Sequence, residues 1–391
     1  MTETIGVGLV GSSFMGRAHS QAWRNAAAFF DLPARPVMAA LAGRDPDRTA
    51  AAASSLGWAS AETGWRRLLE RDDVQIVDIC TPGDSHAEIA VAALEAGKHV
   101  ICEKPLATTV AEAEAMTAAA VKAAAAGVRS MVAFNYRRVP AVALARRFVE
   151  QGRLGRVRHV RAQYLQDWIV DPEFPLVWRL QKERAGSGSL GDIGAHIIDT
   201  AQFVLGEPLT GVSGLTETFV RERPLADSSA GLSAGSSSTV KGPVTVDDAA
   251  LFLGRFAGGA LGTFEATRFA SGRKNAMRIE VNGSLGSLSF DFEAMNELWF
   301  HDHALPAGEA GFRRILVTEA DHPYAGAWWP PGHGLGYEHA FTHEIRDFLV
   351  AVAEGADPAP SFADGLGVQR VLAAIEKSAA DESRFTAVEE T

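Results

Sequence analysis

The first 133 residues alternate short apolar runs with longer helical patterns, and this alternation restricts the possible folds more than any other feature of the chain. Short runs that are almost continuously hydrophobic are typical of strands buried on both faces of a sheet. The strands are predicted at residues 5–11, 37–43, 74–80, 99–104 and 130–134. The helices between them are predicted at 15–30, in the Ala-rich stretch up to 56, at 85–97 and at 108–127. This order predicts a parallel sheet with crossover helices.

The pattern changes at about residue 155, where apolar and polar residues begin to alternate without long helices between the runs. Such alternation is typical of an antiparallel sheet with one solvated face. The runs lie at 156–165, 249–269, 277–292 and 297–302. A Ser- and Gly-rich stretch at 222–246 is predicted to be a mobile surface loop. Two helices are predicted near the end, at about 337–354 and 363–380.

These patterns predict an α/β protein of two domains, which a chain of 391 residues is long enough to form. Residues 1–133 would form a doubly wound, dinucleotide-binding Rossmann domain. Residues 134–391 would form an α+β domain with a large, open, mostly antiparallel sheet, which binds substrate and mediates oligomerisation. An open apolar face usually becomes an oligomer interface, so a homodimer or homotetramer is expected.

The charge of the chain excludes some classes of partner. A net charge of −11, with scattered basic residues, argues against nucleic acid or an anionic membrane as the main partner. No run reaches the roughly 18 apolar residues of a membrane span, and the N-terminus lacks the features of a signal peptide. The two cysteines, Cys80 and Cys102, match no zinc spacing and are expected to be reduced and buried. A cytoplasmic protein is expected.

Two glycine patterns overlap at the first strand. Gly6, Gly8 and Gly11 match G-x-G-x-x-G but lie within the predicted strand, where they cannot reach a phosphate. Gly11, Ser13 and Gly16 instead follow the strand and open the helix, which is where a phosphate-binding turn belongs. The N–H groups at the start of that helix would bind the pyrophosphate of a dinucleotide.

The end of the second strand selects between NAD and NADP in this fold. An acid there binds the ribose 2′-hydroxyl of NAD, whereas an arginine accepts the 2′-phosphate of NADP. The sequence offers both, as Arg44 and Asp45. Either cofactor is therefore compatible, with NAD slightly favoured.

Lys104 follows a predicted parallel strand, at the sheet edge where open α/β sheets bind their ligands. There a lysine can donate to a substrate hydroxyl and take part in proton transfer. The alternative is a surface lysine at the end of a strand. Pro105, which follows it, is a candidate for a cis peptide bond.

Asp192, His196 and Asp199 lie in the otherwise apolar stretch GSGSLGDIGAHIIDT, residues 186–200. On an α-helix, positions i, i+4 and i+7 share one side, so the three fit a metal site, an acid–base site or an internally satisfied polar cluster. Asp192 and Asp199 would be about 10 Å apart along the helix axis, too far for one metal. No metal is therefore expected, and the first choice is an acid–base site.

The stretch 81–107, which ends in Glu103, Lys104 and Pro105, resembles the glucose-fructose oxidoreductase, inositol dehydrogenase and rhizopine-catabolism (Gfo/Idh/MocA) family. The stretch 186–200 resembles the second motif of the same family. The resemblance implies NAD(P)-dependent oxidation of a secondary alcohol in a sugar or cyclic polyol. It also implies three catalytic residues, namely Lys104, Asp192 and His196.

Separate roles follow for these three residues. His196 would accept the proton from the hydroxyl group that is oxidised, because its pKa is near neutral. Lys104 would donate to the reacting oxygen, and Asp192 would hold a neighbouring hydroxyl or orient the substrate. Asp199 would orient His196. The full set of cofactor-binding residues expected is Gly11, Ser13, Phe14, Met15, Gly16, Arg44, Thr81, Pro82, His86, Glu103 and Lys104.

Substrate contacts are expected from polar and aromatic side chains, because a sugar needs many donors and acceptors together with aromatic faces. They are Tyr136, Gln163, Trp168, Asp192, His196, His333 and Tyr337. The region of His333 and Tyr337 resembles a subgroup of levoglucosan-type anhydrosugar or glycoside dehydrogenases. Two other classes remain open, an NAD-assisted glycosidase on the same fold and a non-catalytic NAD(P)-binding sensor.

Overall fold

The computed structural model describes residues 3–226, 235 and 238–389, and the chain divides into two compact units. Unit 1 comprises Met1–Asn135 and Gly336–Leu366, and unit 2 comprises Tyr136–Leu335 and Gly367–Thr391. The sequence-based boundary put everything after residue 133 into the second domain. Residues 336–366 group with unit 1 instead, because the helix in this segment packs on the first helix of the chain.

Unit 1 contains a six-stranded parallel sheet with the strand order β3-β2-β1-β4-β5-β6. This is the strand order of dinucleotide-binding Rossmann domains. The strands are β1 (Glu3–Val10), β2 (Ala34–Gly43), β3 (Ala61–Thr63), β4 (Ile76–Ile79), β5 (His99–Cys102) and β6 (Ser130–Val132). Five of them match predicted strands. β3 is additional, because its three residues, two exposed and one partly buried, show no hydrophobic pattern.

The helices of unit 1 are α1 (Phe14–Phe29), α2 (Pro46–Leu56), α3 (Trp65–Leu69), α4 (His86–Glu95), α5 (Val110–Ala124) and α9 (Tyr337–Glu354). Helix α5 begins at a capping box in which Thr109 and Glu112 each bind the other's backbone N–H. α9 packs alongside α1, so that Phe341 and Phe348 join Trp23 and Leu9 in one buried core. The core thus fixes α1, whose first turn carries the glycine-rich loop.

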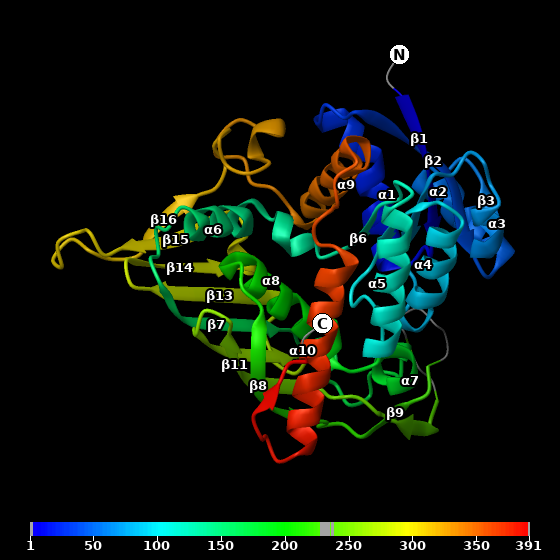
Figure 1. Cartoon of the computed structure of the whole chain (residues 1–391). Coiled ribbons are helices and arrows are strands. Elements are labelled where there is room, and N and C mark those ends of the chain that lie inside the picture. The colour runs from blue at the N-terminus through cyan, green and yellow to red at the C-terminus, as the bar shows by residue number, and fades with distance from the viewer. Residues whose placement is uncertain (1–2, 227–234, 236–237, 390–391) are drawn as a thin grey trace. The chain divides into compact units, whose positions relative to one another are not determined.

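Unit 2 contains a nine-stranded sheet with the order β16-β15-β14-β13-β7-β12-β11-β8-β17 (Figure 1). All pairs are antiparallel except β7 and β12. The strands are β7 (Val157–Leu165), β8 (Leu209–Glu217), β11 (Ala249–Phe256), β12 (Leu261–Thr267), β13 (Ala276–Gly283), β14 (Gly286–Asp291), β15 (Glu297–Asp302), β16 (Arg313–Leu316) and β17 (Thr386–Ala387). The two sheets confirm the predicted fold class.

Helices cover one face of this sheet. α6 (Pro140–Glu150) packs on β14 and β15, and α8 (Ala195–Leu205) packs on β7 and β13. α10 (Phe362–Ala380) lies over β8, where the Ser378 hydroxyl accepts the Gly214 N–H at 3.0 Å. A short helix, α7 (Lys182–Ala185), precedes the stretch 186–200. Among the described helices, none combines the length and the hydropathy that a bilayer span requires.

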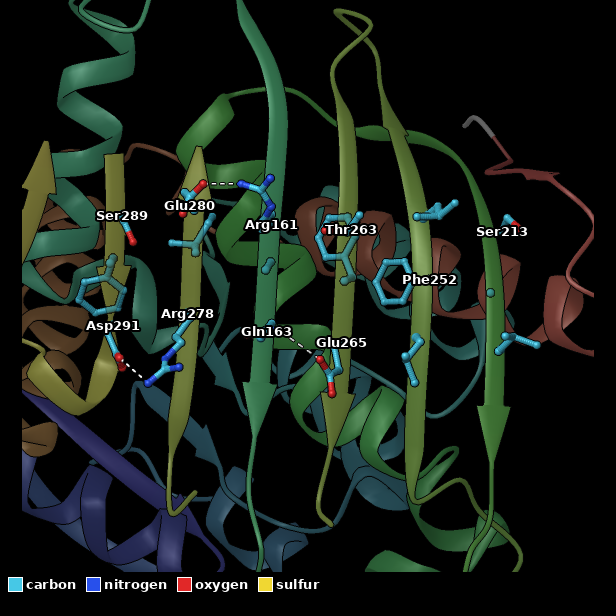
Figure 2. Close-up of a pocket in the computed structure, with 18 of the residues that line it drawn as sticks. Arg161, Gln163, Ser213, Phe252, Thr263, Glu265, Arg278, Glu280, Ser289 and Asp291 are labelled. Carbon is cyan, nitrogen blue, oxygen red and sulfur yellow. Dashed lines mark hydrogen bonds and ion pairs between the residues drawn. The ribbon is translucent and has the colours of Figure 1, made fainter. Parts of the chain in front are cut away.

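The other face of the sheet is open (Figure 2). Along β7, the side chains of Ala162 and Tyr164 are buried on the helix side, while Arg161 and Gln163 line a hollow on the open side. This alternation follows from the two-residue period of a strand. The hollow has a volume of about 810 Å³.

The stretch 222–246 is not a continuous loop. β9 (Glu222–Pro224) and β10 (Lys241–Pro243) pair antiparallel, so the loop prediction is corrected at both of its ends. These three-residue strands contain proline and glycine, which concealed them in the sequence. The predicted mobility concerns mainly residues 227–234 and 236–237, which lie outside the described residues.

Candidate active site

The glycine-rich loop lies between β1 and α1, in the register Gly11, Ser13, Gly16. Gly11 has φ = 99°, in the left-handed region that favours glycine. A Cβ on Gly11 would stand 2.8 Å from the Cys80 carbonyl oxygen, and one on Gly16 would stand 2.1 Å from the Gly11 carbonyl oxygen. Ser13 precedes α1 and makes no side-chain cap, so it leaves the N–H groups of the first turn available to an anion. The loop therefore fits the pyrophosphate of a dinucleotide.

The acid at the end of β2 is already engaged within the chain. The Asp45 carboxylate caps α2 by accepting the Arg48 N–H at 3.0 Å. Arg44, next to it, is exposed. The end of β2, where the ribose is expected, thus presents one exposed arginine and one carboxylate that serves as a helix cap.

A buried charge cluster holds the backbone next to Lys104. His19 of α1 contacts Asp78 through Nδ1 at 2.9 Å and Glu103 through Nε2 at 3.1 Å. Burial alone would lower the pKa of His19, but Asp78 and Cys80 together outweigh it and hold the pKa well above its usual value. The second Glu103 oxygen accepts the Lys104 N–H at 3.0 Å. The cluster therefore fixes the backbone from which the Lys104 side chain extends.

His86 fixes the other side of the same turn. Its ring nitrogens lie 3.0 Å from the Pro105 carbonyl oxygen and 2.9 Å from that of Thr81. The Lys104-Pro105 peptide bond is cis. His86 is buried and joins the two loops through these contacts, and its expected contact with the cofactor stays a prediction.

Among the described residues, His19, Asp78 and Cys80 form a group close enough to hold a metal ion. All three are buried, and they already bind one another and Trp23, whose Nε1 donates to Asp78 at 2.7 Å. Burial raises the pKa of the Cys80 thiol well above its usual value. These contacts favour a protonated histidine and thiol over metal ligation. Both cysteines are free and buried.

The stretch 186–200 begins with a π-helical turn, Leu190–Gly194, before α8. Asp247 caps this turn, because its carboxylate accepts the Gly188 N–H at 2.7 Å and the Leu190 N–H at 2.8 Å. The predicted continuous α-helix is therefore corrected at its start, because Asp192 lies in a π turn and only His196 and Asp199 lie in α8. Such turns often occur at functional sites.

Asp199 is an ion-pair partner of Arg137. The Arg137 guanidinium donates from Nε to the Asp199 carboxylate at 2.9 Å, and both side chains are nearly buried. The structure thus shows a bidentate charge pair at this position. Its geometry is that of a structural link between α8 and the segment after β6.

His196 packs against a network of polar side chains in unit 2. The Tyr136 ring lies 4.5 Å from the His196 ring, and the Tyr136 hydroxyl is 2.6 Å from that of Tyr164. The Tyr164 hydroxyl donates to Asn275 Oδ1 at 2.7 Å. Gln166 Nε2 also donates to Asn275 Oδ1, and Trp168 Nε1 donates to Gln166 Oε1 at 3.0 Å. We call these five side chains, Tyr136, Tyr164, Asn275, Gln166 and Trp168, the polar network.

The structure brings together some of the predicted substrate residues and separates others. Tyr136, Trp168 and His196 belong to one continuous set of contacts. Gln163 does not, because the strand alternation turns it to the open face, where it donates to Glu265 (Figure 2). His333 is exposed and contacts the Pro330 carbonyl oxygen at 2.9 Å.

Tyr337 belongs to unit 1 and starts α9. Its ring stacks on Phe14 of the glycine-rich loop, with 6.1 Å between the centroids and an angle of 5° between the planes. Phe14 is one of the residues predicted to bind the cofactor. The geometry within unit 1 therefore associates Tyr337 with the dinucleotide loop.

Sequence reasoning missed four residues of the site. Tyr164 could have been found, because the alternation of β7 puts it on the same face as Val160 and Ala162. Asn275 precedes β13 and Arg268 follows β12, and neither lies in a recognisable motif. Gln166 stands in the stretch at the end of β7 that the sequence singled out, but it was not among the residues chosen.

Comparison with known proteins agrees with these observations. Residues 5–134 match the profile of an oxidoreductase family with an NAD-binding Rossmann fold, and residues 142–289 match the Gfo/Idh/MocA C-terminal domain. The family match, together with the loop and the sheet order, identifies an NAD-binding oxidoreductase. The chain belongs to the Gfo/Idh/MocA family, which confirms the expected family and cofactor class.

Several relatives are similar over their whole length. Levoglucosan dehydrogenase of Pseudarthrobacter phenanthrenivorans is 45% identical over 97% of both chains. Inositol 2-dehydrogenase of Rhizobium meliloti is 27% identical over 98% of this chain and 99% of that one. Among solved structures, an oxidoreductase domain protein from Kribbella flavida is 64% identical with a TM-score of 0.94, covering 99% of this chain and 100% of that one. A levoglucosan dehydrogenase in complex with NADH and levoglucosan is 44% identical, with a TM-score of 0.93 and the same coverage.

Proposed function

We propose that this protein is an NAD-dependent dehydrogenase that oxidises a secondary alcohol of a sugar or cyclic polyol, and that an anhydrosugar of the levoglucosan type is its first candidate substrate. The observation that carries the proposal is the 45% identity to levoglucosan dehydrogenase over 97% of both chains. The contacts around His196 support it, because the polar network offers hydroxyl, amide and aromatic groups to a hydroxylated ring.

The residues of the chain have distinct roles in this proposal. NAD, when bound, supplies the nicotinamide that takes up the hydride. His196 accepts the proton of the hydroxyl group that is oxidised, a task for which imidazole has a suitable pKa. Lys104 donates a hydrogen bond to the same oxygen and stabilises its developing negative charge. Asp192 accepts a hydrogen bond from a neighbouring hydroxyl and so orients the ring.

The test is a screen of levoglucosan, myo-inositol and simple aldoses with NAD and with NADP, followed by absorbance at 340 nm. Formation of NADH with at least one of them is expected. In Lys104→Ala and His196→Ala, kcat should fall about 100-fold or more while NADH binding is retained. Activity within a few fold of wild type in Lys104→Ala would contradict the assigned site.

The same screen separates the two rival functions. An NAD-assisted glycosidase would release a free sugar from a glycoside without net formation of NADH. A sensor would bind the dinucleotide and turn over none of the compounds. In either case the dehydrogenase proposal fails, although the family assignment remains.

We propose further that the open face of the unit 2 sheet forms a homodimer or homotetramer interface. Leu215, Leu251 and Leu253 are 61%, 49% and 59% exposed on neighbouring strands, which is unusual for large apolar side chains. Charge pairs such as Arg278 with Asp291 lie on the same open face, on β13 and β14, with β7 and β12 between them and the leucines (Figure 2). In sedimentation experiments, Leu253→Glu should shift the mass toward the monomer, and a monomeric wild type would contradict this interface.

We propose a cytoplasmic location, because a dehydrogenase of this class draws on the cellular pool of NAD. The two free, buried cysteines are compatible with a reducing compartment. Fractionation of the source cells should recover the protein with soluble cytoplasmic enzymes. Recovery from the medium would contradict the proposal.

A further inference from the structure

Arg268, directly after β12, is a fully buried arginine of unit 2 that lies next to Asp192. Its Nη1 is 3.6 Å from Asp192 Oδ2, and its Nη2 donates to the Asp247 carbonyl oxygen at 3.3 Å. Its Cζ lies 5.2 Å from the centre of the Trp168 ring. Arg268 therefore contacts one predicted catalytic residue and one predicted substrate residue.

The charge of Arg268 requires compensation. A buried guanidinium without a negative partner is strongly destabilising. Within the described residues, Nε and Nη1 of Arg268 make no hydrogen bond. The buried Asp248 carboxylate, whose Oδ2 accepts the N–H groups of Phe219 and Val220 at 2.8 and 3.1 Å, also balances part of the charge of Arg268 electrostatically. Asp192 is the carboxylate within ion-pair distance of Nη1.

In the ion pair of Arg268 and Asp192, the arginine is buried and the carboxylate is partly accessible to solvent. Arg268 has no exposed side-chain surface, whereas the Asp192 side chain is 26% exposed. A substrate could therefore reach Asp192 but not Arg268. At 3.6 Å the contact is an ion pair that is too long for a hydrogen bond, so Arg268 attracts the carboxylate through its charge.

The contacts of Arg268 continue to His196. Trp168, on which Arg268 stacks, is one end of the polar network, and Tyr136, which packs on His196, is the other end. Each step between them is a hydrogen bond. A displacement of Arg268 would thus act on Asp192 directly and on the ring beneath His196 through the network.

We infer that Arg268 is a positioning residue for the reaction: it holds the Asp192 carboxylate toward the substrate and supports the Trp168 side of the polar network. The inference rests on the proposed function insofar as Asp192 binds a substrate hydroxyl. It makes Asp192 and Arg268 an energetically coupled pair. A purely structural arginine at this position would not be coupled to Asp192.

Arg223 provides the matched control. It is equally buried and belongs to the same charge cluster, but its guanidinium donates to the carbonyl oxygens of Ile169 and Asp171, each at 2.7 Å. Its replacement should cost stability in the same way as replacement of Arg268. Arg223→Lys therefore reports the general effect of disturbing a buried arginine in this part of the fold.

The first experiment requires no activity. Crystal structures of the wild type, Arg268→Met and Arg223→Met without substrate would be compared. In Arg268→Met, the Asp192 carboxylate should turn away from its wild-type position, and in Arg223→Met it should not move. If Arg268→Met does not fold, Arg268→Gln replaces it, because it removes the charge but keeps an amide that can donate to the Asp247 carbonyl oxygen. An unchanged Asp192 in the Arg268 variant would overturn the inference even if the enzyme had no sugar substrate.

The second experiment is a double-mutant cycle on kcat/KM with the substrate found in the screen. Arg268→Lys alone should lower kcat/KM about 10- to 100-fold. In the Asp192→Asn background the same change should cost less than about threefold, because the carboxylate that it holds is gone. Equal losses in both backgrounds, as expected for Arg223→Lys, would overturn the inference. A wild type without turnover would instead contradict the proposed function and leave the structural comparison to decide on Arg268.

Discussion

The hydroxyl groups of Tyr136 and Tyr164 lie 2.6 Å apart, and the Tyr136 ring packs on His196 with 4.5 Å between the centroids. In Tyr136→Phe the ring remains, but the Tyr164 hydroxyl loses one partner. A hydrogen bond of this kind contributes about 1 kcal/mol, so kcat/KM should fall about fivefold. NADH binding, measured by fluorescence titration, should not change.

The ring and the hydroxyl of Tyr136 can be separated by a second variant. Tyr136→Ala removes the packing on His196 as well, and its kcat should fall further than that of Tyr136→Phe. If Tyr136→Phe lowered the melting temperature but left kcat/KM unchanged, the hydroxyl pair would serve stability alone.

The pH dependence of stability should reveal His19. Its folded pKa is raised above the ordinary value of 6.5 despite burial, because Asp78 favours the charged ring. A raised folded pKa stabilises the protein fully below the unfolded pKa, and the stabilisation is lost as pH rises through the folded pKa. His19→Gln should therefore reduce the melting temperature most at pH 6, and the difference from wild type should shrink toward pH 10.

His303→Gln is the control for this series, because His303 is exposed, its Nδ1 contacts the Ser284 carbonyl oxygen, and its ring packs edge-on against the ring of His301. Among the described residues, no carboxylate pairs with it as Asp78 pairs with His19. Its melting temperature should follow the wild type at every pH. A constant difference between wild type and His19→Gln from pH 6 to pH 10 would contradict a charged His19.

The fold could be predicted where hydrophobic periodicity is strong. β1 and α9 were found almost to the residue, since a buried strand and a long amphipathic helix each give a clear repeat. The short strands β3, β9 and β10 were missed, because three residues are too few to show a period. The place of α9 in unit 1 depends on contacts distant in sequence, with Trp23 and Leu9, which no local pattern reveals.

The candidate site was predictable where residues lie in motifs. Lys104 and Asp192 stand in such motifs, and Gly11, which opens the predicted phosphate-binding register, has the positive φ that favours glycine. The π turn could not be predicted, because its apolar pattern is that of an ordinary helix. Arg268 could not be found either. It follows β12, whose residues alternate between exposed and buried, and a single arginine at the end of such a strand usually lies on the surface. Only contacts of the tertiary fold bury it.

Gly16 should be essential for the shape of the dinucleotide loop. In Gly16→Ala the new methyl group would meet the Gly11 carbonyl oxygen at 2.1 Å, so α1 or the turn must shift. The dissociation constant for NADH should rise at least tenfold, and the free energy of unfolding should fall by about 1–3 kcal/mol. Titration calorimetry and urea denaturation would measure the two effects.

Gly367 in α10 is the matched control, because a Cβ there would meet nothing within 4 Å. Gly367→Ala should leave NADH binding unchanged and stabilise the helix by up to about 1 kcal/mol. Wild-type affinity for NADH in Gly16→Ala would contradict the assigned register of the loop.

The pair of Arg137 and Asp199 should contribute to stability and not to the chemical step. Removal of one partner from a buried pair leaves an uncompensated charge, which costs about 3–5 kcal/mol. Asp199→Asn should therefore lower the free energy of unfolding strongly, and the double variant with Arg137→Met should recover part of the loss, as urea denaturation would show. At a temperature where Asp199→Asn is folded, its kcat should stay within about threefold of wild type. A loss of 100-fold, comparable to that expected for His196→Ala, would instead place Asp199 in the catalytic site.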